Sequence, residues 1–285
     1  MKLAIGTAQF GMSYGINNSA GKVSQGAIKQ ILNYAASVGI SSIDTAIAYG
    51  DSEKSLGRAG VENFDVISKL PPIPENCTNV AKWILHEVKG SLSRLGVRSI
   101  YGFMLHRPDQ LYGPMGNKIL ASLMDLKSAG LVRKIGVSVY DPSELDRFFS
   151  LLDFDIVQCP YNLMDRRLVS SGWLDKLNMS GVEVHIRSSF LQGLLLMERN
   201  VIPSKFEKWK NYWDKWDEWV RDNNVTRLRG CLSYCLSCEG VDKVVVGVDK
   251  VSQLEEIVAS ANSKVINSLP ELSCSDPNLI NPANW

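Results

Sequence analysis

The sequence predicts an α/β protein whose parallel strands close into a (β/α)8 barrel. Eight short apolar segments alternate with segments whose apolar residues recur about every 3.6 positions, a pattern typical of strands joined by helical crossovers. No Gly-x-Gly-x-x-Gly motif follows any of these strands, so the fingerprint of the open, dinucleotide-binding sheet is missing. Polar residues instead end nearly every strand, as they do where a barrel carries its site.

The composition is that of an ordinary globular protein. The 285 residues are 45% hydrophobic and 21% charged, and no linker interrupts them, which favours a single barrel domain over residues 1–285. A formal net charge of +1 provides no field to attract nucleic acid or an anionic membrane. No run approaches the ~18 apolar residues of a membrane span, and the start lacks the apolar core of a signal peptide. We therefore expect a cytoplasmic protein with a small-molecule partner.

The alternation of elements begins at the N-terminus. A short apolar strand opens the chain, and a turn-rich connection then runs through Asn17, Asn18 and Gly21. Ser24 is suited to cap the amphipathic helix expected over residues 25–38, whose apolar side chains follow the helical period.

Seven further strands and their helices continue the pattern. The strands are expected at residues 40–44, 64–69, 99–105, 134–138, 156–158, 183–187 and 243–247, and the helices at 52–59, 79–95, 116–129, 141–151 and 165–179. Gly96, Gly130 and Gly181 each lie where one of these helices must end, since glycine readily adopts the left-handed conformation found there.

The last third of the chain contains two segments of distinct character. Residues 205–220 place Trp209, Trp213, Trp216 and Trp219 at helical spacing, which indicates a helix packed on the barrel, although one tryptophan could line a pocket. Residues 269–285 contain three prolines and no period, and we expect an extended tail over the surface.

Six cysteines are too few for a disulfide scaffold. Cys231, Cys235 and Cys238 fall at i, i+4 and i+7, which is one face of a helix. A metal site would need further ligands, and none is close in the sequence. We therefore predict reduced, metal-free cysteines that serve core packing.

Ionisable side chains end three successive strands in the first half of the chain. Asp44 ends the second strand, Lys69 the third and His106 the fourth, and Tyr49 lies on the loop after Asp44. Because the carboxyl ends of the strands of a barrel meet at one face, these four side chains are candidates for one site.

The residues at this point resemble the aldo-keto reductase family, over about residues 3–260. The matching motifs are Gly6-Thr7, Phe10-Gly11, Asp44-Thr45-Ala46, Tyr49-Gly50, Ser52-Glu53, Leu56-Gly57, Lys69, Leu105-His106-Arg107-Pro108, Ile135-Gly136-Val137-Ser138, Gln158, Tyr161-Asn162, Leu191 to Gly193, Val246-Gly247, Gln253-Leu254 and Glu256. The resemblance implies a barrel that reduces an aldehyde or ketone, sugar-related carbonyls being one candidate, with Asp44, Tyr49, Lys69 and His106 as the catalytic residues.

The expected chemistry assigns a role to each of the four. Reduction of a carbonyl by hydride creates an alkoxide, which takes a proton from Tyr49. We expect the ammonium of Lys69 to lower the pKa of that phenol, with Asp44 holding Lys69. His106 would donate a hydrogen bond to the carbonyl oxygen.

The resemblance also implies the residues that hold a nicotinamide cofactor. Ser138 and Gln158 match the positions that bind the carboxamide, while the asparagine usual after that serine is replaced by Val139. Arg187 replaces the aromatic residue that stacks on the nicotinamide. The remaining implied contacts are Gly6, Thr7 and Asp44 on the early strands, the pyrophosphate loop at Ser188, Phe190, Gln192 and Gly193, and Gly247, Lys250, Gln253 and Glu256 after the last strand.

The adenosine end is expected to select between NADPH and NADH. Gly247 and Gln253 occupy positions where relatives often have cations, which leaves Lys250 as the nearby cation, beside Asp249. We expect NADPH to be preferred by a narrow margin, with NADH possible.

Two other functions are compatible with the sequence. A regulatory protein could keep the barrel and the cofactor with little turnover. A barrel aldolase could use Lys69 to form a Schiff base.

Overall fold

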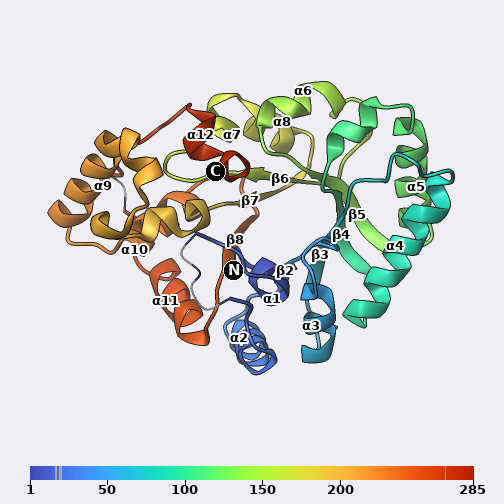
Figure 1. Ribbon diagram of the computed structural model, residues 1–285, viewed down its shortest axis with the longest axis horizontal. Coiled ribbons are helices and arrows are strands. Elements are labelled where there is room, and N and C mark those ends of the chain that lie inside the picture. The colour runs from blue at the N-terminus through green and yellow to red at the C-terminus, as the bar shows by residue number, and fades with distance from the viewer. Residues whose placement is uncertain (17, 19–20, 267) are drawn as a thin grey trace.

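The computed structural model describes residues 1–16, 18, 21–266 and 268–285, so part of the expected turn-rich connection, including Asn17, lies outside the described residues. Eight parallel strands form a closed barrel in the order β1 to β8, with β8 paired to β1 (Figure 1). The predicted (β/α)8 barrel is confirmed. The described residues include no helix long and apolar enough to cross a membrane.

All eight predicted strands are present. They are β1 (Leu3–Gly6), β2 (Ser42–Asp44), β3 (Asp65–Leu70), β4 (Ile100–Leu105), β5 (Val132–Ser138), β6 (Ile156–Pro160), β7 (Glu183–Arg187) and β8 (Lys243–Gly247). Successive side chains alternate between the barrel interior and the helical layer. Residues two apart on one strand therefore share a face, as do Ser138 and Gly136.

Helices surround the barrel and cover the outer face of the strands (Figure 1). They are α1 (Ala8–Gly11), α2 (Gln25–Ser37), α3 (Ser52–Ala59), α4 (Val80–Leu95), α5 (Gly116–Ser128), α6 (Leu145–Phe148), α7 (Arg167–Ser170), α8 (Trp173–Met179), α9 (Lys210–Asp222), α10 (Arg227–Leu236), α11 (Val251–Ala261) and α12 (Pro277–Ile280). One large cluster of buried apolar side chains fills the layer between helices and barrel. A smaller one, of Ile67, Met104 and Ile156, lies apart from it.

Two predicted helices are shorter or divided. The one expected at 165–179 is split into α7 and α8, because Gly172 between them has a φ of +77° and interrupts the helical backbone. The one expected at 141–151 is a 3-10 turn capped by Asp141, followed by the single turn of α6. Helix α1 was not predicted, since its four residues are too short to show a period.

The tryptophan-rich segment forms a 3-10 turn at Ser204–Trp209 and then α9. Trp213 and Trp216 are almost fully buried, which confirms the packing role, and none of the four tryptophans lines the large cavity described below. Cys231 and Cys235 are buried on α10, but Cys238 lies beyond the end of that helix and is only half-buried. The predicted cysteine face therefore contains two residues.

Residues 269–285 pack closely on the protein. The segment is extended up to Asp276, which caps α12, and ends in a 3-10 turn at Pro282–Asn284. The indole of Trp209 donates to the Asp276 carboxylate at 3.1 Å, and the indole of Trp219 donates to the Ser268 carbonyl at 3.0 Å. Leu272, Leu279 and Ile280 are buried. The tail is thus anchored, and its end reaches the cavity.

The β5–β6 junction provides a test of the barrel packing. A Cβ at Gly136 would lie 1.8 Å from the Ile156 carbonyl oxygen, whereas a Cβ at Gly26 on α2 would meet nothing within 4 Å. We expect Gly136→Ala to lower the free energy of unfolding by at least about 1–3 kcal/mol, because two backbones must separate. Gly26→Ala should leave it unchanged or raise it by up to about 1 kcal/mol. Urea denaturation of both variants measures these changes. Equal changes in the free energy of unfolding would contradict the close approach of β5 and β6 at Gly136.

Candidate active site

A buried ion pair lies at the centre of the predicted site. The ammonium of Lys69, at the end of β3, donates to both carboxylate oxygens of Asp44 at 2.7 and 2.8 Å and to the Thr45 carbonyl at 2.9 Å. Lys69 is 1% and Asp44 4% exposed. All three ammonium hydrogens therefore have acceptors, as a buried ammonium requires.

Two polar side chains from the opposite wall extend this pair. Gln158 on β6 donates from Nε2 to Asp44 Oδ2 at 2.7 Å, and Ser138 Oγ on β5 donates to Gln158 Oε1 at 3.2 Å. Gln158 is fully buried and does not line the cavity. Its amide thus connects Ser138 to the ion pair, and both Ser138 and Asp44 line the cavity.

Tyr49 and His106 lie next to the ion pair on the cavity side. Their rings make an edge-to-face contact with centroids 5.8 Å apart. The Lys69 ammonium lies 5.3 Å from the centroid of the Tyr49 ring. The structure therefore brings the four predicted residues together, from β2, β3, β4 and the loop after β2.

A tight contact with α1 holds the loop that carries Tyr49. A Cβ at Gly11 would lie 1.7 Å from the Tyr49 carbonyl oxygen, so only glycine permits this approach. Ser52, at the start of α3, donates to the Thr7 carbonyl at 2.9 Å. Both contacts join the β1 loop to the Tyr49 loop.

Burial is the largest cause of the pKa shifts of Tyr49 and His106. Burial and the Asp44 carboxylate raise the pKa of Tyr49, while Arg187 opposes them. The expected lowering of the pKa of Tyr49 by Lys69 is therefore not found, because Asp44 neutralises that ammonium. Burial also lowers the pKa of His106 to about 4, assisted by the charges of Lys69 and Arg187. Tyr49 is a neutral phenol and His106 a neutral imidazole at neutral pH.

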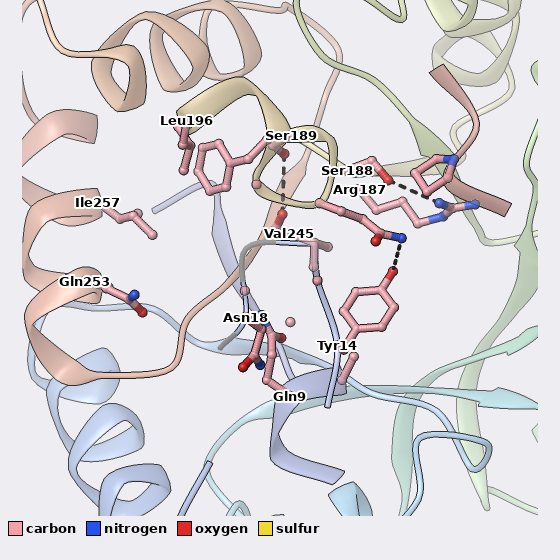
Figure 2. A pocket seen from close by; sticks show the side chains of 18 of the residues that line it. Gln9, Tyr14, Asn18, Arg187, Ser188, Ser189, Leu196, Val245, Gln253 and Ile257 are labelled. Atoms are coloured by element: carbon pink, nitrogen blue, oxygen red, sulfur yellow. Dashed lines mark hydrogen bonds between the residues drawn. The ribbon is translucent and has the colours of Figure 1, made fainter. Parts of the chain in front are cut away.

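A cavity of about 880 Å³ opens above these residues. Asp44, Tyr49 and His106 line one end. The other predicted cofactor contacts that line it are Gly6, Thr7, Ser138, Arg187, Ser188, Phe190, Gln192, Gly193, Gly247, Gln253 and Glu256. Figure 2 shows its length, with Arg187 on one side and Gln253 and Ile257 on the other. The volume lies within the range of ligand pockets.

The turn after β7 has an unusual backbone. Ser188, Leu191 and Gln192 have φ angles of +61°, +49° and +53° without being glycine, and Gly193 follows at +95°. Each such residue costs about 1–3 kcal/mol, and such strain is concentrated at ligand sites. Asn162, fully buried, stabilises the turn by donating to the Ser188 carbonyl at 3.0 Å. This turn is the predicted pyrophosphate loop, and it lines the cavity as that role requires.

Arg187 ends β7 inside the cavity. Its guanidinium donates to the Val139 carbonyl at 3.0 Å and to Ser188 Oγ at 3.3 Å, and it lies 4.5 Å above the ring of Tyr140 (Figure 2 shows the Ser188 contact). These contacts fix the plane of the guanidinium beside Val139, the residue that follows Ser138.

The far end of the cavity lies against the start of α11. Gln253 Oε1 accepts from the backbone N–H groups of Asp249 and Lys250 at 2.7 and 3.3 Å. Lys250 is exposed and does not line the cavity, whereas Asp249 and Glu256 do. Burial raises the pKa of Asp249. This end is therefore more acidic than the sequence indicated.

Several lining residues were missed in the sequence. Tyr140 lies two residues beyond Ser138, the last residue of β5, and a search for polar residues just after strand ends would have found it. Tyr14, Arg227 and Pro282 come from loops, a helix start and the tail, for which no local pattern exists. Arg227 forms an ion pair with Asp217, to which its guanidinium donates at 2.7 Å.

Fold and site together define an enzyme of the (β/α)8 barrel class, with polar side chains at the carboxyl ends of its strands around one large cavity. Residues 2–270 match the Aldo/keto reductase family. The chain belongs to this family, as its motifs predict.

Individual relatives are more distant. The chain is 27% identical over 274 residues to an L-glyceraldehyde 3-phosphate reductase of Escherichia coli O157:H7, covering 82% of this chain and 79% of that protein. It is 31% identical over 124 residues to an NADH-specific methylglyoxal reductase of Escherichia coli (strain K12), covering 42% of this chain and 37% of that protein. The holo form of an aldo-keto reductase from Bacillus halodurans has a similar structure, with a TM-score of 0.73 at 20% identity over 93% of this chain and 88% of that one.

The low pKa of His106 gives stability a pH dependence that can be tested. The unfolded state binds a proton below about pH 6.5, but the folded state does so only near pH 4. The contribution of His106 is therefore complete above pH 6.5 and is lost as the pH falls toward 4. We expect His106→Gln to flatten the slope of unfolding free energy against pH over this interval. The exposed His86 on α4 supplies the control, His86→Gln, and equal slopes in wild type and His106→Gln would contradict the burial argument.

Proposed function

We propose that this protein reduces an aldehyde or ketone to the alcohol with a reduced nicotinamide cofactor. The observation that supports this most is the buried Lys69–Asp44 pair beside Tyr49 and His106 at one end of a cavity of about 880 Å³. When bound, the cofactor supplies the hydride. The side chains of this chain then provide orientation and the proton.

Tyr49 is the proposed proton donor. Its pKa is raised, so the phenol is fully protonated before reaction, and a developing alkoxide is basic enough to take that proton. His106, being neutral, retains one ring N–H to donate to the carbonyl oxygen. The Lys69–Asp44 pair fixes the polar wall on which Tyr49 packs.

The cavity fits the proposed cofactor in two places. Ser138 lies where a carboxamide can reach its hydroxyl, and the strained turn from Ser188 to Gly193 presents backbone to the cavity, as a pyrophosphate site does. We propose NADPH as the preferred cofactor by a narrow margin. The start of α11 and Lys250 favour a 2′-phosphate, and Asp249 and Glu256 oppose it.

The proposed substrate class is a small, polar, sugar-related carbonyl compound. Three phenols, from Tyr14, Tyr49 and Tyr140, line the catalytic end together with Gln192, so hydroxyl groups of a substrate would find partners there. A relative that reduces L-glyceraldehyde 3-phosphate agrees with this class. A screen of short aldehydes and hydroxyketones that follows the absorbance of reduced cofactor tests the proposal.

The two other functions have less support. A Schiff base requires a lysine accessible to substrate, but Lys69 is buried behind the cavity with its three hydrogens engaged. A regulatory protein without turnover would need no assembled donor, whereas Tyr49 and His106 both reach the cavity. Turnover in the screen separates these functions from reduction.

Replacement of Tyr49 is the most direct test of the mechanism. We expect Tyr49→Phe to lower turnover by at least ~10²-fold and to preserve cofactor affinity, because only the transferable proton is lost. Tyr14→Phe, which removes another cavity phenol, is the matched control and should cost less than ~10-fold. Steady-state kinetics and cofactor titration measure both. Wild-type turnover in Tyr49→Phe would show that another group donates the proton.

Substitutions at the far end test the cofactor preference. We expect Lys250→Ala to weaken NADPH binding about twofold to fivefold, and Asp249→Asn to strengthen it by a similar factor, because each changes one charge near a helix start. NADH binding should change little in either variant. Fluorescence titration of each variant with both cofactors gives four dissociation constants, each of which is divided by the wild-type value. Parallel changes for NADPH and NADH would mean that neither residue senses the 2′-phosphate.

A further inference from the structure

The guanidinium of Arg187 has no carboxylate partner among the described residues. Its contacts are a carbonyl oxygen of Val139, a hydroxyl of Ser188 and the ring of Tyr140, all of them neutral. Arginine keeps its charge at any physiological pH. A half-buried cation without a compensating charge therefore faces the cavity.

The other ionisable groups that line the cavity at this end contribute no net charge. Lys69 and Asp44 share their protons within one hydrogen-bonded pair, so their charges add to zero whichever of them holds the proton. His106 is neutral, because burial keeps its pKa near 4. Asp141 and Asp165 do not line the cavity; both form ion pairs with the single guanidinium of Arg167, so this group keeps one negative charge outside the lining. Among the described residues that line the catalytic end, Arg187 thus carries the uncompensated charge.

The order of strands places Arg187 on the cofactor wall. Ser138 and Gln158, the predicted carboxamide residues, lie on β5 and β6, and Arg187 lies on the adjacent β7, bonded to the residue after Ser138. Tyr49 follows β2, across the barrel from β6, and His106 follows β4, which borders β5 on the side away from β6 and β7. A pyridine ring whose carboxamide reaches Ser138 must therefore lie next to the guanidinium, with the substrate on the side of Tyr49.

We propose that Arg187 makes this site bind reduced nicotinamide cofactor more tightly than the oxidised form and so favours reduction over oxidation. The ring is neutral when reduced and carries a positive charge when oxidised, and a cation a few ångströms away disfavours only the charged form. An aromatic residue at this position would lack that discrimination. The inference rests on the proposed function, because it assumes that a nicotinamide cofactor binds in this cavity.

The test compares the affinities for both oxidation states in four proteins. These are wild type, Arg187→Met, Arg187→Lys and Lys210→Met, the last removing an exposed charge on α9 that makes no ion pair within the described chain. Binding of NADPH and NADP⁺ is measured by fluorescence and calorimetry at fixed ionic strength. NADH and NAD⁺ are titrated in the same way, so that the result does not depend on the 2′-phosphate.

We expect the ratio of the oxidised to the reduced dissociation constant to fall about tenfold or more in Arg187→Met, which is about 30 mV in the potential of the bound couple. Arg187→Lys keeps the charge, so its ratio of dissociation constants should stay close to the wild-type value. The ratio in Lys210→Met should equal that of wild type. If Arg187→Met does not fold, Arg187→Gln replaces it in the same comparison.

Three results would overturn the proposal. An unchanged ratio in Arg187→Met would show that the guanidinium does not sense the ring. An equal loss of both affinities would place Arg187 on a part of the cofactor common to both forms. Unchanged affinities, with a selective loss of activity toward glyceraldehyde 3-phosphate relative to glyceraldehyde, would assign Arg187 to a substrate anion. Binding without turnover of any carbonyl would instead refute the proposed function and leave the ratio measurable.

Discussion

The interaction on which the site depends is the buried pair of Lys69 and Asp44. An ammonium cannot be buried without acceptors, and the loss of either member would leave the other as an uncompensated charge, at a cost of about 3–5 kcal/mol. The pair is therefore a constraint on β2 and β3, whose ends must stay in register for three hydrogen bonds to form. Gln158 extends this constraint across the barrel to β6.

Closure of the barrel converts this local constraint into a complete site. Residues separated by up to 143 positions in sequence, from Asp44 to Arg187, come to one face because all eight strands are parallel and end there. The loops above them are then fixed by contacts that only small groups permit. Gly11 against the Tyr49 carbonyl is one, and the Ser52 hydroxyl against the Thr7 backbone is another. The precision of the site is thus a property of the strand ends and of the first two loops.

These origins explain what could be predicted from the sequence. Asp44, Lys69, His106, Ser138 and Arg187 lie at the carboxyl ends of strands, and the short apolar segments before them located those ends. Pro282 reaches the cavity because Trp209 and Trp219 anchor the tail, and Arg227 because α10 packs beside α11. Both depend on long-range contacts. The direction of the pKa shift of Tyr49 could not be predicted from the sequence either. The sequence places Asp44 with Lys69, but the burial that contributes most to the raised pKa of Tyr49 exists only in the folded protein.

The two ends of the cavity carry opposite electrostatic character, and this separates two properties of the cofactor. The 2′ position of adenosine would meet Asp249, Glu256 and the start of α11, whereas the pyridine ring would meet Arg187. The 2′-phosphate is the same in both oxidation states, so the far end can choose between NADPH and NADH without influencing direction. The ring is the same in NADPH and NADH, so Arg187 can influence direction without choosing between them. Arg187 ends β7, whereas Asp249 and Glu256 lie in the loop after β8 and on α11. Because the two groups share no hydrogen bond among the described contacts, substitutions at the two ends should act additively on binding free energy.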